Sequence, residues 1–98
     1  MEIELSPDFE SNFRRRANQK IRKLYRSRVA LLLKNPFDPS LNVHPLNYEL
    51  KGYFSFSLTD NSGTDDYRVL FKKTRQGYYF ADFGTHDQLY RPWRRPSA

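Results

Sequence analysis

The stretch YFSFSL, residues 53–58, decides the class of fold, because its side chains alternate in character along an extended chain. One side carries Phe54, Phe56 and Leu58, and the other carries Tyr53, Ser55 and Ser57. Such alternation is typical of a β-strand with one buried face. Upstream, apolar residues recur at helical spacing instead, so the chain changes from helix to sheet before this strand.

Two further strands are predicted downstream. DYRVLFKK, residues 66–73, and YYFADF, residues 78–83, read as strands, and TRQG, residues 74–77, is a short hairpin connection between them. TDNSGTD, residues 59–65, has the composition of a turn. The opening EIEL, residues 2–5, can add an edge strand.

Residues 7–34 carry the helical pattern. Ser6 can cap the helix, Pro7 suits its first position, and Asn35-Pro36 ends it. One helix of this length would span roughly 42 Å, about three times the radius of gyration expected of so small a domain. We therefore expect a break near residues 16–20 and a helical hairpin, with one apolar and one basic face.

These elements predict an α+β fold in which two N-terminal helices pack on one face of a small antiparallel sheet, in the order β-α-α-β-β-β. The other face of the sheet is left uncovered. With 98 residues the chain can build one core, so we expect a single domain over residues 1–98, with a flexible tail from about residue 92.

The charge predicts a polyanionic partner. The net charge is +6, and residues 11–37 hold nine Lys or Arg and no acid. RNA or DNA is the first candidate partner, and an acidic protein is the second. The chain has no cysteine, its N-terminus lacks the pattern of a signal peptide, and its longest apolar run is Val29–Leu33. We expect a cytoplasmic protein without membrane contact.

Two histidines offer chemistry near neutral pH. His86 follows a predicted strand at a Gly84-Thr85 bend, and Tyr90 shares its helical face if residues 86–91 form a turn. His44 precedes a proline, and the simpler interpretation is a loop histidine that bonds to the backbone.

Arg68 is the one guanidinium within a predicted strand. Its burial requires a carboxylate or a bound anion as a partner. A cross-strand pair with Asp82 is the structural alternative to a functional role.

Cleavage of RNA through its 2′-hydroxyl needs a base, a cation for the charge on phosphorus, and an acid for the departing oxygen. His86 can act as acid or base, Arg68 can stabilise the charge, and Tyr90 can donate a hydrogen bond or stack on a base. Acidic residues beside the predicted turn lack the spacing of metal ligands. We expect neither a metal nor a cofactor.

Four segments in this order resemble the RelE/ParE superfamily of toxin-antitoxin toxins, in its YafQ- and YoeB-like branch. They are LLLKNP (residues 31–36), HPLNYELKGYFSFSL (44–58), DDYRVLFKK (65–73) and DFGTHDQLY (82–90). The resemblance implies a RelE-like fold and a ribosome-dependent mRNA endoribonuclease that a cognate, acidic antitoxin silences.

The resemblance also implies roles for residues. Arg68 would face the scissile phosphate, His86 would act in acid-base catalysis, Tyr90 would orient the RNA, and His44 would contribute as in some members. Basic residues would contact mRNA and ribosomal RNA. The candidates are Arg14, Arg15, Arg16, Lys20, Arg22, Lys23, Arg26, Lys51, Lys72, Lys73 and Arg91.

Some positions depart from the family pattern. Ser55 and Ser57 stand on a strand where many members carry cations, and Asp82 stands near an arginine of YafQ-like toxins. Fewer cations mean less stabilisation of charge on phosphorus. Two alternatives therefore stay open: a non-catalytic gyrase poison of the ParE kind, and a catalytically weakened relative that binds RNA or its antitoxin.

Overall fold

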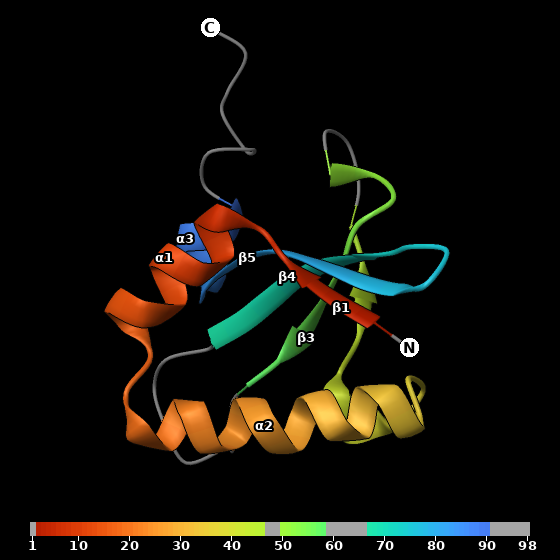
Figure 1. Ribbon diagram of the computed structural model, residues 1–98, viewed down its shortest axis with the longest axis horizontal. Helices are drawn as coiled ribbons and strands as arrows, with labels where there is room; N and C mark the ends of the chain where they lie inside the picture. Colours follow the sequence, from red (N-terminus) through yellow and green to blue (C-terminus); the bar gives the residue numbers. More distant parts are fainter. Residues whose placement is uncertain (1, 47–49, 59–66, 91–98) are drawn as a thin grey trace, which may run out of the picture.

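The computed structural model describes residues 2–46, 50–58 and 67–90. Its elements are β1 (Glu2–Leu5), α1 (Pro7–Arg16), α2 (Gln19–Lys34), the short 3₁₀ helix η1 (Pro39–Leu41), β2 (His44–Pro45), β3 (Phe54–Ser57), β4 (Tyr67–Lys73), β5 (Gly77–Thr85) and α3 (His86–Tyr90). Figure 1 shows α1 and α2 as separate helices beside one twisted sheet. The predicted turn at residues 59–65 and the predicted tail lie outside the described residues.

The helical hairpin forms where the sequence predicts it. The Ser6 hydroxyl accepts the Phe9 amide at the start of α1, and Pro7 occupies the first turn. The Asn18 side chain accepts the Ile21 amide over 2.8 Å and begins α2. Each cap satisfies a backbone donor that has no partner within its helix, so the two caps fix the break between the helices.

The sheet has the order β1-β5-β4-β3-β2. The hairpins β3–β4 and β4–β5 are antiparallel, as predicted. The two-residue strand β2, which the sequence did not predict, pairs antiparallel with β3. β1 runs parallel to β5, so the sheet is mixed, whereas the sequence predicted an antiparallel one. The register places Ile3 opposite Tyr78, and both side chains join the core beneath the helices.

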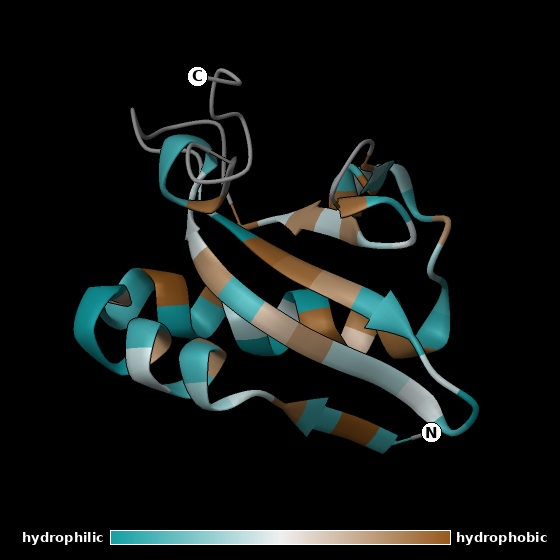
Figure 2. Ribbon diagram, turned by 90° about the horizontal axis from the view of Figure 1, so that it is seen from above, coloured by the Kyte–Doolittle hydropathy of each residue, from teal (hydrophilic) through white to brown (hydrophobic). Residues whose placement is uncertain are grey.

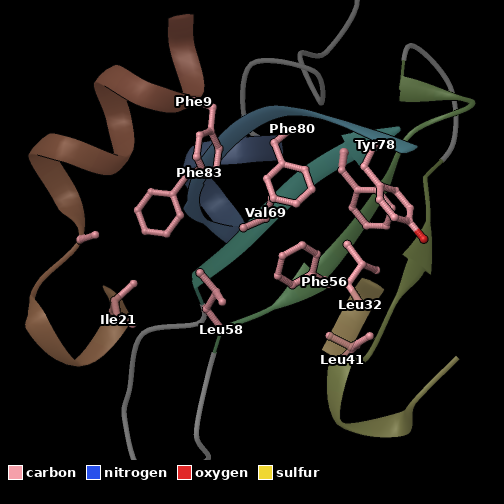
Figure 3. Close-up of a cluster of buried hydrophobic side chains, with 12 residues drawn as sticks. Phe9, Ile21, Leu32, Leu41, Phe56, Leu58, Val69, Tyr78, Phe80 and Phe83 are labelled. Carbon is pink, nitrogen blue, oxygen red and sulfur yellow. The ribbon is translucent and has the colours of Figure 1, made fainter. Parts of the chain in front are cut away.

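The core lies between the helices and one face of the sheet. Its rings come from α1, β3, β4 and β5, and Figure 3 shows Phe9, Phe80 and Phe83 close together above Phe56. Phe56, Phe80 and Phe83 are wholly buried. Each large side chain so buried contributes roughly 1.5–3 kcal/mol through the hydrophobic effect.

The opposite face of the sheet carries the candidate chemistry. Seen from above in Figure 2, the long strands β4 and β5 cross the view with no helix over their middle. A smaller apolar cluster of Leu50, Leu70 and Leu89 lies on this side. We call this side of the sheet the uncovered face.

Candidate active site on the uncovered face

Arg68 lies on the uncovered face at the centre of the sheet. It is opposite Ser57 on β3 and Gly84 on β5, and it is 4% exposed. Its Nε donates to the Ser55 hydroxyl over 2.8 Å, and its Nη2 donates to the Asn42 carbonyl over 2.8 Å and to the Ser55 carbonyl over 3.3 Å. The guanidinium thus reaches across β3, where oxygens of Ser55 and Asn42 hold it in place.

Asp82 does not pair with Arg68, so the cross-strand pair considered for these two residues is wrong. The Asp82 carboxylate accepts the Asn12 side-chain amide over 2.7 Å and its neighbour Phe83's amide over 2.7 Å. Asp82 lies opposite Leu70, two positions along β4 from Arg68. Its bond to Asn12 ties β5 to α1.

His44 lies in a strand, whereas the simpler interpretation of the sequence placed it in a loop. It pairs with Ser55 in the two-residue strand β2, and it is exposed. Residues directly opposite each other in an antiparallel pair point to the same face. Since Arg68 bonds to Ser55, the imidazole of His44 and the guanidinium of Arg68 share the uncovered face.

His86 begins α3 directly after β5, as the predicted helical turn requires. The Thr85 hydroxyl accepts the Gln88 amide over 3.3 Å, and the Gln88 side-chain oxygen accepts the Thr85 amide over 2.9 Å. This reciprocal capping pair fixes the first turn of α3. The His86 side chain is 52% exposed, and its Nδ1 lies 3.9 Å from a carboxylate oxygen of Asp87.

β4 and α3 come together at one end of the sheet. Tyr67, the first residue of β4, is opposite Thr85, the last residue of β5. His86 comes directly after Thr85, so it lies near the end of β4 that carries Arg68. The side chain of Tyr90 and the whole of Arg91 lie outside the described residues. Their proposed roles remain predictions.

Gly84 has a role that the sequence analysis missed. The prediction was a bend, but Gly84 lies within β5. A Cβ there would stand 2.8 Å from Arg16 Nη1 and 2.9 Å from the Gln88 side-chain oxygen, so these two side-chain ends pack closely over Gly84 and would have to shift to admit a larger residue. Arg16 also donates to the Phe83 carbonyl over 3.1 Å, and it thereby joins the end of α1 to the strand that leads to His86.

The described basic residues predicted to bind RNA lie on several elements, namely α1, α2, β4 and the segment before β3, and their contact with RNA remains a prediction. Arg15 bonds to Asn12, and Arg22 donates to the carbonyls of Ala17 and Arg14 while it stacks over Phe13. Arg22 thereby joins α2 to the end of α1, whereas the Arg15 bond lies within α1. The exposed members are Arg14, Arg15, Lys20, Lys23, Arg26, Lys51 and Lys73.

Lys72 and Lys73 point to opposite faces of β4. Lys72 Nζ lies over Tyr53 and Tyr79 on the uncovered face, and Lys73 Nζ lies over Phe54 on the helix-covered side. Adjacent strand residues cannot share a face, so the two lysines cannot serve one RNA path across the uncovered face.

Within residues 2–46, 50–58 and 67–90, no three His, Cys, Asp or Glu side chains form a group that could hold a metal ion. In the same described part of the chain, no helix combines the length and apolarity needed to cross a bilayer.

The fold is that of the solved YafQ and YoeB structures, and it confirms, at the level of the fold alone, the resemblance seen in the sequence. The chain is similar to YafQ from E. coli strain BL21(DE3), with 23% identity over 91% of this chain and 97% of YafQ and a TM-score of 0.70. It is similar to a YoeB/ParE toxin from Agrobacterium tumefaciens, with 14% identity over 88% of this chain and 99% of that toxin and a TM-score of 0.71.

A chain of the YoeB-YefM complex from Staphylococcus aureus is 17% identical, with a TM-score of 0.69 over 88% of this chain and 97% of that one. YafQ has also been solved as a DinJ-YafQ toxin-antitoxin complex, with which this chain shares 22% identity and a TM-score of 0.67 over 91% of this chain and 96% of that one. No protein-family model matches the sequence. No curated protein matches it either.

Proposed function

We propose that this chain is the toxin of a toxin-antitoxin system and that it cleaves mRNA on the ribosome without a metal ion. The observation that carries the proposal is the position of Arg68, a buried cation fixed on the uncovered face of a RelE-like sheet. His44 lies on the same face. His86 follows the end of β5 that pairs with the start of β4, next to Arg68.

The proposed reaction is transfer of a phosphodiester within the RNA. The 2′-oxygen attacks the adjacent phosphorus, the bond from phosphorus to the 5′-oxygen of the next nucleotide breaks, and a cyclic phosphate and a 5′-hydroxyl result. One imidazole takes the proton of the 2′-hydroxyl, and an acid gives a proton to the departing oxygen. We assign these roles to His86 and His44.

Arg68 stabilises the negative charge that develops on the phosphorane oxygens. Its guanidinium is held by Ser55 and Asn42 before substrate binds, so little reorganisation is needed during the reaction. Tyr90 is proposed to orient the RNA base at the cleavage site.

The partner that silences the toxin is proposed to be an acidic antitoxin. YafQ and YoeB have been crystallised with DinJ and YefM, respectively. The net charge of +6 favours an acidic protein, because opposite charges accelerate and orient association.

The test is expression in bacteria, followed by mapping of transcript ends. The unmodified chain is expected to arrest growth and to produce 5′-hydroxyl ends inside codons of translated messages. His86→Gln is expected to restore growth while the Tm of the purified protein stays close to that of the parent. Arg68→Lys is also expected to restore growth, but with a lower Tm, because lysine cannot make the three hydrogen bonds of the buried guanidinium. Toxicity that persists in both variants would remove the proposed chemistry. DNA damage signalling with intact mRNA would assign the chain to the gyrase poisons.

A further inference from the structure

A lysine lies against two tyrosines on the uncovered face, at the other end of β4 from Arg68. Lys72 Nζ is 5.6 Å from the ring centre of Tyr53 and 5.3 Å from that of Tyr79. Tyr79 is directly opposite Lys72 in the pairing of β4 with β5. Both rings are half-buried, and cation–π attraction holds the ammonium group beside them.

The two tyrosines border a groove of about 440 Å³. Leu50, Leu70 and Ala81 supply apolar lining, and Ser6, Pro7, Asp8 and Asp82 lie along the α1 side. The groove therefore has aromatic and apolar walls and an acidic α1 side, and Lys72 lies next to it, against the two tyrosine rings.

The groove continues the line that begins at Arg68. Alternate residues of a strand share a face, so β4 presents Arg68, Leu70 and Lys72 in a row. Four residues of a strand cover about 13 Å. A single nucleic-acid strand that places one phosphate at Arg68 can reach Lys72 with a neighbouring nucleotide.

We propose that this groove is a second binding site for the RNA strand, where a nucleotide next to the cleavage site stacks its base on Tyr53 or Tyr79 and places its phosphate at Lys72. This inference rests on the proposed function. Stacking on tyrosine is tolerant of base identity, so the site adds affinity with little sequence preference. Asp8 and Asp82 repel phosphate and thereby keep the backbone on the Lys72 side.

The experiment measures binding of a fluorescent six-nucleotide RNA that carries 2′-O-methyl groups throughout and so cannot be cleaved. Tyr53→Leu and Tyr79→Leu are each expected to weaken its binding about tenfold. Tyr53→Phe and Tyr79→Phe are expected to retain binding within about twofold, because phenylalanine keeps the stacking surface. The Tm of each variant shows that the fold is kept.

A second measurement uses the dependence of affinity on salt. Lys72→Gln is expected to lower the slope of log affinity against log salt by about 0.7, the value for one phosphate contact on a single strand. Lys73→Gln is the matched control, because Lys73 is the adjacent residue of β4 and lies over the Phe54 ring on the helix-covered side. Its slope is expected to equal that of the parent.

The outcomes separate this site from the proposed function. Folded leucine variants that bind the oligonucleotide like the parent would overturn the site, whether or not mRNA is cleaved. Tyrosine-dependent binding by a chain that leaves mRNA intact would keep the site and remove the nuclease. If a polyglutamate peptide binds in a tyrosine-dependent way and the oligonucleotide does not, the groove belongs to an acidic protein and the proposal is wrong.

Discussion

The guanidinium of Arg68 and the hydroxyl of Ser55 meet over 2.8 Å on the uncovered face, and both side chains are almost wholly buried. The register of β3 with β4 brings them together, because Ser55 lies two positions along β3 from Ser57, the residue opposite Arg68. A small hydroxyl therefore decides where the positive charge of the candidate active site lies.

Ser55→Ala is expected to lower the free energy of unfolding by about 1.5–3 kcal/mol, because the buried guanidinium loses an acceptor of a charge-assisted hydrogen bond. Urea denaturation measures the change. Ser27→Ala is the control, because the Ser27 hydroxyl bonds to the Leu24 carbonyl on the exposed surface of α2. The control is expected to change stability by less than about 0.5 kcal/mol. Equal effects in the two variants would contradict the importance of the Arg68 contact.

Thr85→Ala is expected to destabilise the first turn of α3 by about 1 kcal/mol, because the Gln88 amide loses its capping oxygen. Hydrogen exchange of the α3 amides and the NMR signals of the His86 ring report the change. Thr85→Ser keeps the hydroxyl and is expected to behave like the parent. An unaltered His86 spectrum in Thr85→Ala would show that the capping pair does not position the imidazole.

Gly77→Ala is expected to separate β1 from the sheet. A Cβ at this position would stand 2.0 Å from the Glu2 carbonyl oxygen and 2.7 Å from the Glu2 nitrogen, so the β1 backbone must move. Overpacking of this kind costs about 1–3 kcal/mol. Faster hydrogen exchange confined to β1 and its partner β5 would be the signature.

Gly52→Ala is the comparison for that experiment. A Cβ at Gly52 meets no atom within 4 Å, and its positive φ of 94° makes any cost one of local backbone strain. This variant is expected to leave the exchange of β1 amides unchanged. Loss of β1 protection in both variants would indicate global destabilisation instead of a local clash.

Tyr25→Phe is expected to be more stable than the parent at alkaline pH. Burial raises the pKa of Tyr25 from 10.0 to about 12. The unfolded chain loses this proton first, so the stability linked to Tyr25 is present below pH 10 and is lost as the pH rises to about 12. Phenylalanine has no proton to lose. Thermal unfolding at pH 8 and pH 11.5 measures the effect, and a difference in Tm that does not grow with pH would contradict it.

The sequence by itself determined the longer helices and strands of this protein, because their signals are local, but it missed the short strand β2. Ser6 and Asn18 cap helices within three residues of themselves, and the alternation of residues 53–58 already separates the covered from the uncovered face. The α+β class, the break between the helices and the start of α3 at His86 follow from such short-range rules.

Tertiary structure alone decided the partners of the polar side chains. The parallel pairing of β1, the bond of Asp82 to Asn12 and the contact of Arg68 with Asn42 join residues that are far apart in the chain. The sequence contains many donors and acceptors that could satisfy each of these polar groups equally well. The choice is made when the helices and strands pack, because only then does a buried donor meet one particular acceptor.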